Sequence, residues 1–384
     1  MKRTVLYLSL LLSATSLKAQ VLNGGINTNG SQTNAILTAV PFLNIAPDAR
    51  SSGMGDAGVA LEPTTYSTFW NPSALAFLED GKNISLSYSP WMRKVTPDAN
   101  LGYVNFTQKV GLRSAIGFSL RYFNLGEINV YDYNENALGS YHPNELSLDA
   151  AYALKFGPNF SLGLAMRYIR SSIVRSGASI DGANGKVGNA VAADVSLYYR
   201  KPVEQFGKTG TFSFGTNISN IGTKMSYYNV GPSYFLPTNL KVGVADMIQL
   251  DDLNQFTFAF DINKLLVPTP PLRDQNGNIV KGKNDDRSVV SGIFGSFTDA
   301  PGGFSEEIKE VAFSPGVEYM YNHIFALRTG YFYEAPSKGN RQYLTLGAGF
   351  KVKGFNLDFS YLIASQQNSP LANTLRFSLN YNFK

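Results

Sequence analysis

Three glycines near the N-terminal end have the spacing of a phosphate-binding loop. Gly53, Gly55 and Gly58 reproduce the G-x-G-x-x-G pattern that holds the pyrophosphate of a dinucleotide. That chemistry requires a strand before the first glycine and a helix after the last, within a parallel β-α-β unit. The residues before Gly53 show no strand pattern, and Pro63 with a threonine-rich stretch follows Gly58. The pattern therefore predicts glycines that allow tight packing, not a nucleotide site.

The other residue types that could catalyse a reaction or hold a metal are scattered. His142 and His323 fall in predicted loops at opposite ends of the strand array, and the chain contains no cysteine. No G-x-S-x-G turn that would present a nucleophilic serine occurs. Asp251–Asp252 and Asp285–Asp286 are loop carboxylates without the ligand spacing of a calcium hand, so we expect solvated charge, with weak calcium binding as the alternative. We expect no catalytic residue, no cofactor and no metal, and hence no enzyme.

From Asn83 onward the chain alternates large apolar and small polar residues. The last segment is the clearest, because Leu375, Phe377 and Leu379 alternate with Arg376 and Ser378. Alternation with period two predicts a β-strand with one apolar and one polar face. The pattern occurs about fourteen times, at residues 84–88, 104–106, 116–122, 146–154, 160–168, 191–199, 212–218, 240–244, 256–262, 317–321, 325–333, 344–350, 355–363 and 375–383.

The polar faces and the connections indicate where these strands lie. Leu, Phe and Tyr form one face, while Gly, Ser, Asn and Asp form the other, as in strands between lipid and a wet lumen. Long connections such as 124–144 mostly alternate with tight ones such as 157–159, whereas a soluble β-sandwich has no reason to separate loop lengths in this way. We predict an all-β fold, a transmembrane antiparallel β-barrel of about 14 strands in the outer membrane of a Gram-negative cell. The predicted lumen-facing residues include Ser147, Asp149, Ser213, Asn217, Asp358 and Ser360.

The N-terminal residues have the pattern of a secretory signal. Lys2 and Arg3 precede an apolar run and then small and polar residues, so we predict a signal peptide over residues 1–19. Leu17 makes the cleavage site imperfect. The net charge of +5 falls to about +2 without the three cationic residues of this segment, which predicts no nucleic-acid partner.

Two segments do not fit the barrel wall. Residues 20–82 lack alternation and are rich in Gly, Asn, Ser, Thr and Ala, so we predict a hatch that folds into or beneath the barrel of residues 83–384. Residues 265–310 interrupt the strands as a long extracellular loop. Apolar spacing in this loop predicts a short amphipathic helix that either packs on the barrel rim or docks on another protein. These candidate partner-binding residues are Val289, Val290, Ile293, Phe294 and Phe297.

Charged residues at inward positions form a further candidate set. They alternate with apolar neighbours, so we expect them to point into the lumen. There they would either form an internal ion-pair network or contact a substrate. The arginines are Arg121, Arg167, Arg328 and Arg376, and the carboxylates are Asp149, Asp194, Asp261, Glu318 and Asp358.

The N-terminal segment also resembles a known family. The runs at 41–50, 53–58 and 70–75 are similar to the PorV family of type IX secretion barrels, within the FadL-like superfamily of hatch-plugged outer-membrane proteins. The match covers roughly residues 40–80. The Asn71-Pro72 element of the 70–75 run is shared by relatives with other functions, whereas the residues at 45–50 favour the PorV family. The hatch-motif residues are Gly53, Gly55, Gly58, Trp70, Asn71 and Pro72.

The resemblance implies a role that composition alone does not show. Proteins of this family are not enzymes. They bind the C-terminal signal domain of secreted cargo and associate with the large translocon barrel. They then pass the cargo to a surface attachment complex that contains a sortase-type protease. The expected function is therefore a non-enzymatic outer-membrane component of type IX protein secretion. The alternative is a FadL-type channel for hydrophobic small molecules, which would require a continuous apolar pocket. An open porin ranks third, because the hatch would obstruct the lumen.

Overall fold

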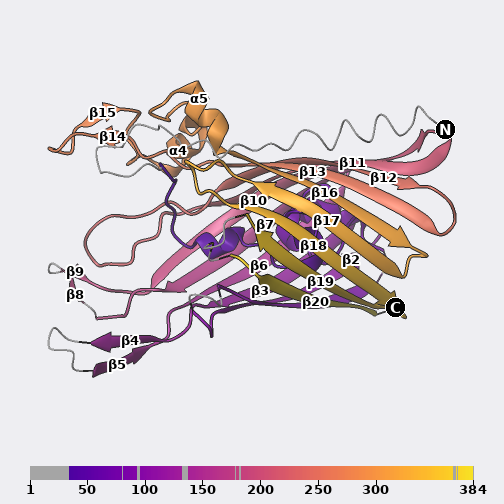
Figure 1. Ribbon diagram of the computed structural model, residues 1–384, viewed down its shortest axis with the longest axis horizontal. Helices are drawn as coiled ribbons and strands as arrows, with labels where there is room; N and C mark the ends of the chain where they lie inside the picture. Colours follow the sequence, from indigo (N-terminus) through magenta and orange to yellow (C-terminus); the bar gives the residue numbers. More distant parts are fainter. Residues whose placement is uncertain are drawn as a thin grey trace.

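The chain forms a closed antiparallel β-barrel around its own N-terminal segment (Figure 1). The computed structural model describes residues 34–79, 81–92, 96–131, 137–177, 179–180, 183–365, 369 and 371–383. The predicted signal peptide at 1–19 lies outside these residues. No helix in the described ranges has the length and apolar character needed to cross a membrane.

Fourteen strands make the barrel wall, each pairing with its neighbours in chain order until β20 closes on β1. The count and the antiparallel pairing match the prediction, and each predicted strand lies within one observed strand. The wall strands are β1 (Lys82–Pro90), β2 (Asn100–Val110), β3 (Ser114–Asn124), β6 (Asn144–Lys155), β7 (Phe160–Ser172), β10 (Gly188–Gln205), β11 (Lys208–Gly222), β12 (Asn239–Gln249), β13 (Asn254–Leu265), β16 (Val311–Tyr321), β17 (Phe325–Tyr333), β18 (Gln342–Val352), β19 (Phe355–Ala364) and β20 (Thr374–Phe383).

The two faces of the wall differ as the alternation requires. On β3, for example, Phe118 and Leu120 point outward and are exposed, while Ser119 and Arg121 point inward and are buried. Exposure of these apolar side chains to water would cost free energy, whereas contact with the lipid of a bilayer is favourable. The lumen-facing residues predicted above are all buried: Ser147, Asp149, Ser213, Asn217, Asp358 and Ser360.

The connections separate strictly by length between the two ends of the barrel. At one end each turn has two to four residues, and at the other each loop has eight or more. Because outer-membrane barrels keep their short turns in the periplasm, the long-loop end is the outer end. It carries three small hairpins and, in the long loop, two short α-helices and one 3-10 helix (Figure 1). These elements are β4 (Ile128–Tyr131), β5 (Ala137–Tyr141), β8 (Ser179–Ile180), β9 (Ala183–Asn184), β14 (Leu272–Arg273), β15 (Ile279–Lys281), α4 (Val289–Gly295), α5 (Phe304–Glu307) and η3 (Ile308–Glu310).

The described N-terminal residues 34–79 and 81 form the hatch, which lies inside the barrel (Figure 1). The hatch begins at the outer end, where Asn34 donates hydrogen bonds to Pro270 and Ser337, and it ends at the periplasmic start of β1. Its short helices are separated by segments that contain glycine and proline. The apolar residues of these helices pack against the inner wall. They are η1 (Pro41–Asn44), α2 (Ala49–Ser52), α3 (Ser67–Trp70) and η2 (Pro72–Phe77).

Candidate functional site: a plugged lumen and a braced outer loop

The three spaced glycines lie where the hatch backbone approaches other atoms most closely. A side chain at Gly53 would meet the Cα of Gly347 at 3.1 Å, and one at Gly55 would meet the backbone of Tyr331 at 2.6 Å. At Gly58 it would meet the indole ring of Trp70 at 2.3 Å. Gly55 also has a φ of +73°, which favours glycine. Between residue 34, where the described chain begins, and Gly53 there is no strand, so the glycines serve close packing here and this stretch lacks the strand–turn–helix geometry of a dinucleotide site.

The second half of the hatch motif ties the hatch to itself and to the wall. The Trp70 indole Nε1 donates to Asp48 Oδ1 at 2.6 Å, and the other Asp48 oxygen accepts from the Ser51 amide and caps α2. The Asn71 amide donates to the carbonyls of Val59 and, on β10, of Leu197, at 2.8 and 3.0 Å. Pro72 is the first residue of η2. A backbone N–H at this position would have no partner within the helix, so the N–H that proline lacks is not missed.

Wall side chains also bind the hatch backbone directly. Asp261 on β13 was predicted to join an ion pair, but its Oδ2 instead accepts from the amides of Gly58 and Val59 at 2.7 and 2.9 Å. The Ser378 hydroxyl accepts from Ala49, and the Thr345 hydroxyl from Gly55, each at 2.9 Å. The hatch is therefore fixed by groups on several strands around the barrel.

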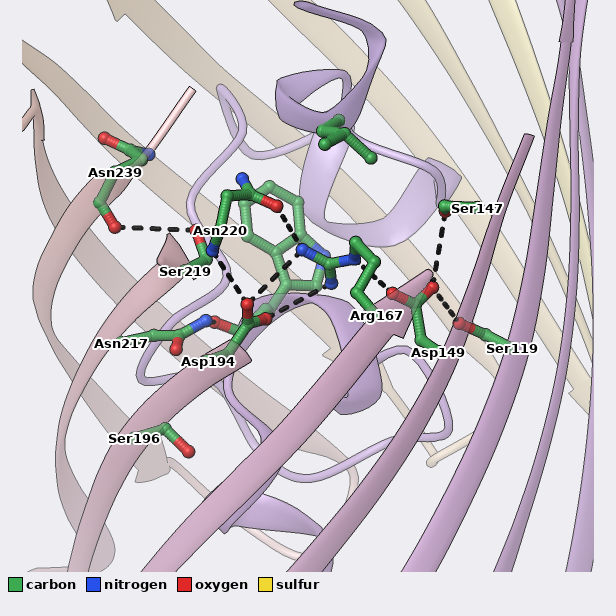
Figure 2. Close-up of polar contacts among 12 residues, drawn as sticks. Ser119, Ser147, Asp149, Arg167, Asp194, Ser196, Asn217, Ser219, Asn220 and Asn239 are labelled. Carbon is green, nitrogen blue, oxygen red and sulfur yellow. Dashed lines mark hydrogen bonds and ion pairs between the residues drawn. The ribbon is translucent and has the colours of Figure 1, made fainter. Parts of the chain in front are cut away.

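A buried arginine with two aspartates forms the first ion-pair cluster (Figure 2). Arg167 pairs with Asp149 on one side and with Asp194 on the other, the latter at 3.2 Å between Nη2 and Oδ2. The backbone N–H of Asn220 donates to Asp194, the side-chain oxygen of Asn220 accepts from Arg167, and the Ser119 hydroxyl donates to Asp149. Side chains at inward positions of β3, β6, β7, β10 and β11 thus satisfy one another across the wall.

A second cluster joins the hatch to the opposite wall. Glu318 accepts from Arg50 at 2.8 Å and from Arg328 at 2.5 Å, and Arg328 also pairs with Asp358 at 2.7 Å. Two guanidinium groups thus face two carboxylates in a buried site, so the charges balance. Arg376 pairs with Asp56 of the hatch at 3.6 Å. The predicted ion pairs are therefore confirmed for Arg167 and Arg328, while Arg376 pairs with a hatch carboxylate that the prediction did not include.

Arg121 departs from the prediction of an ion pair. In the described structure it has no carboxylate within 4 Å, and its Nη1 donates to the carbonyls of Phe42 and Leu43 at 3.3 and 2.9 Å. Its guanidinium also lies 4.6 Å from the ring centre of Phe69 and 5.7 Å from that of Tyr103. Carbonyl dipoles and the Phe69 ring from the hatch, together with the Tyr103 ring from β2, take the place of the expected carboxylate.

The long outer loop is braced by a third set of ion pairs. Lys264 pairs with Glu307 at 3.1 Å and with Glu310 at 2.6 Å, while Lys338 of the next loop pairs with Glu306 and Glu310 at 2.6 and 3.0 Å. Burial alone would raise the pKa of Glu306, but hydrogen bonds from Lys338 and Asn34 outweigh it, so this pKa lies below its usual value. The loop is therefore held in one arrangement over the barrel mouth.

Within this loop the candidate partner-binding residues divide between two faces. The predicted helix is present as α4, with Ser288 as its N-cap, and Gly292 packs it onto Phe235 and Pro268 of the rim. Val290 and Phe294 face away and are 66% and 75% exposed. Val289 and Ile293 are half-buried, and Phe297 is exposed with Lys264 5.8 Å from its ring centre.

Some groups that matter here were not singled out from the sequence. Arg50 and Asp48 lie in the stretch without alternation, so no pattern indicated that they face partners. Phe304 and Ile308 add further exposed apolar area to the loop. The inward position of Lys241 could be predicted from the sequence, because Lys241 falls between the outward-facing residues of its strand.

Catalytic or metal-binding geometry is not found in the part of the chain described. No group of three or more His, Cys, Asp or Glu residues in these ranges could hold a metal ion. His142 lies beside β6 at the outer end, whereas His323 lies in a periplasmic turn, so the two histidines share no site.

The fold is similar to that of solved outer-membrane transporters. The toluene transporter TodX of P. putida matches with a TM-score of 0.51 at 11% identity, over 88% of this chain and 98% of that chain. The TodX deltaS2S3 mutant, a monoaromatic hydrocarbon channel, matches with a TM-score of 0.52 at 12% identity, over 88% and 99%. A Pseudomonas aeruginosa FadL homologue has a TM-score of 0.46 at 11% identity, over 92% and 100%. At these identities the likeness is one of fold.

Sequence comparison is more specific. No curated protein matches the chain. The family model described as type IX secretion system protein PorV matches residues 28–272, well over half of the chain and including the whole hatch motif. With its closed wall of lipid-facing strands, this chain is an outer-membrane barrel, and it belongs to the PorV family of type IX secretion system proteins.

Proposed function

We propose that this barrel is a non-enzymatic carrier that binds the C-terminal signal domain of secreted cargo at its outer loops. It receives cargo from the large translocon barrel and passes it to the sortase-type attachment complex at the cell surface. The observation that carries this proposal is the outer loop, where Val290 and Phe294 are exposed on a loop braced by ion pairs. Exposed apolar groups on a pre-ordered support are typical of protein-binding surfaces, because little ordering entropy is lost on binding.

The plugged lumen supports the same proposal by leaving the outer surface as the place of action. The hatch is bound to the wall through Asp261, Ser378 and Thr345, and through the Arg50–Glu318 ion pair. Movement of a folded domain through this lumen would break these buried contacts together. Cargo therefore binds on the barrel and does not pass through it.

The test removes the exposed apolar groups without cutting the loop. Val290→Ser with Phe294→Ser should abolish surface display of cargo while the barrel stays folded, as judged by heat-dependent mobility in electrophoresis. Val280→Ser is the matched control, because Val280 is 67% exposed on β15 of the same loop and lies outside α4. We expect normal display with Val280→Ser. Normal display in the α4 double variant would reject the assigned binding face.

The channel alternative is supported by the likeness of fold to TodX. Against it, the cavity of about 450 Å³ beneath the hatch is lined largely by charged and amide side chains, among them Glu62, Arg200, Arg328, Asn356 and Asn380. Entry of a hydrophobic solute would cost free energy, because it would displace water from these polar groups without replacing their hydrogen bonds. Co-purification with a large secretion barrel supports the carrier, whereas a fatty acid or detergent held tightly in the lumen supports the channel.

A further inference from the structure

A small cavity lies on the outer side of the hatch, between the wall and the loops at the barrel mouth. Its volume is about 60 Å³, and its lining runs from Trp70 of the hatch to Arg341 in the loop after β17. Since one water molecule occupies about 30 Å³ in the liquid, the space fits one small polar group and excludes an acyl chain. Its lining does not belong to the exposed face of α4.

Lys241 supplies an unpaired charge to this cavity. Its side chain comes from β12, and the residue is only 8% exposed. Among the described residues no carboxylate lies within 4 Å of its amine, and no hydrogen bond from it is found; its Nζ lies 4.4 Å from the ring centre of Trp70. An ammonium has three donors, and aromatic faces replace only part of the hydration that burial removes. The amine therefore lacks acceptors on the side that faces the cavity.

Asn263 supplies an unpaired acceptor to the same cavity. It is the direct cross-strand partner of Lys241 on β13, and its Oδ1 is buried without a hydrogen-bond donor. The next residue across the sheet is Ala312, whose small side chain leaves room beside Asn263. One row of the wall thus presents a cation, an acceptor and an open space.

The other charges around the cavity already have partners. Glu334 pairs with Arg341 at 2.8 Å, and Glu310 accepts from Lys338 at 3.0 Å. Asp56 accepts from the Tyr343 hydroxyl at 2.5 Å through Oδ2, and its Oδ1 lies 3.6 Å from Nη1 of Arg376. Lys241 is the cation on this lining without a carboxylate within 4 Å in the described structure. The charges of Asp261 and Asp56 act on it from farther away, and an anion bound in the cavity would be its direct partner.

We propose that this cavity binds the free carboxyl terminus of a peptide that enters from the outer end, with the carboxylate on Lys241 and the last peptide N–H on Asn263. A fatty acid would satisfy Lys241 alone, because it has no N–H to donate. The inference rests on the carrier function proposed above and names the part of the cargo that reaches into the lumen. It adds a second contact to the one at α4.

The experiment measures binding of a purified cargo C-terminal signal domain to the full-length barrel in detergent. The domain is prepared with its native carboxyl terminus, with a carboxyl-terminal amide, and with a Gly-Ser-Gly extension. We expect the amide and the extension to weaken binding about tenfold or more, as loss of a charge-assisted hydrogen bond does. Lys241→Met should weaken binding of the native domain equally and abolish the difference between the native and amidated forms.

Two further variants separate the cavity from general effects. Ala312→Met fills the space while keeping every charge, and it should also weaken binding of the native domain. Lys351→Met removes one positive charge at the periplasmic end and should leave binding unchanged. Competition with oleate tests whether a fatty acid supplies the carboxylate instead. Displacement of the domain by oleate but not by a short free-acid peptide would overturn the assignment to a peptide.

The outcomes distinguish this inference from the function on which it rests. Tight binding of native, amidated and extended domains alike, with no effect of Lys241→Met, would overturn the carboxylate site and leave the carrier function standing. Failure of the native domain to bind the unmodified barrel would overturn both. If Lys241→Met does not fold, Ala312→Met and the amidated domain still decide the question.

Discussion

The hatch and the outer loop are both long departures from the strand pattern, and both are held by buried ion pairs. They differ in what becomes of their apolar side chains. In the hatch, Phe42, Leu43 and Trp70 are each at most 3% exposed, whereas Val290 and Phe294 in the loop are 66% and 75% exposed. The hatch thus uses its apolar residues for its own packing, while the loop leaves part of its apolar residues free. The contrast separates a region that closes the barrel from one that is available to a partner.

The sharpest way to break this contrast is to remove Glu318, the β16 carboxylate that is shared by Arg50 of the hatch and Arg328 of β17. Glu318→Ala leaves Arg50 and Arg328 buried without it, and we expect the free energy of unfolding in lipid vesicles to fall by about 3–5 kcal/mol. Urea titration followed by tryptophan fluorescence measures it. Asp285→Ala breaks the half-exposed pair with Arg273 in the outer loop and should cost less than about 1 kcal/mol. Equal losses in the two variants would show that the hatch is not the tighter region.

A smaller effect is expected from crowding the hatch motif. In Gly58→Ala the new methyl group meets the Trp70 ring at 2.3 Å, so the hatch must shift, at a cost of about 1–3 kcal/mol. Gly157→Ala is the matched control, because nothing lies within 4 Å of its added Cβ, in a periplasmic turn. Limited proteolysis of folded barrels should cut the hatch faster only in Gly58→Ala. An unchanged cleavage rate would contradict the close packing.

The smallest effect concerns the brace of the outer loop and depends on pH. Because the pKa of Glu306 is lowered in the folded loop, its stabilisation is present above the ordinary value of 4.5 and is lost as pH falls through the folded pKa. Hydrogen exchange of the α5 amides should therefore accelerate as pH falls below 4.5, relative to neutral pH and after correction for intrinsic rates. Glu306→Gln should remove most of this dependence, and an identical pH profile in the variant would assign it to another group.

Much of the wall could be predicted from the sequence, because alternation is a local property of each strand. Leu375, Phe377 and Leu379 indicate an outward face wherever β20 lies in the barrel. The same alternation placed Arg167, Arg328 and Arg376 in the lumen. The partner of each charge was harder to predict, since hatch and wall positions meet only in three dimensions. Arg121 and Asp261 accordingly pair with hatch backbone where ion pairs were expected.

The sequence by itself determined the strand number, the lipid-facing surface, the alternation of loop lengths and the family resemblance of the hatch, because all of these are encoded in short-range patterns. Only the tertiary structure decided that the Asp48–Trp70 contact and the Arg50–Glu318 ion pair fix the hatch, that Val290 and Phe294 stay exposed, and that Lys241 and Asn263 share a cavity. These depend on side chains from distant segments meeting in a closed lumen, where each buried polar group must find a partner whose position no local pattern records.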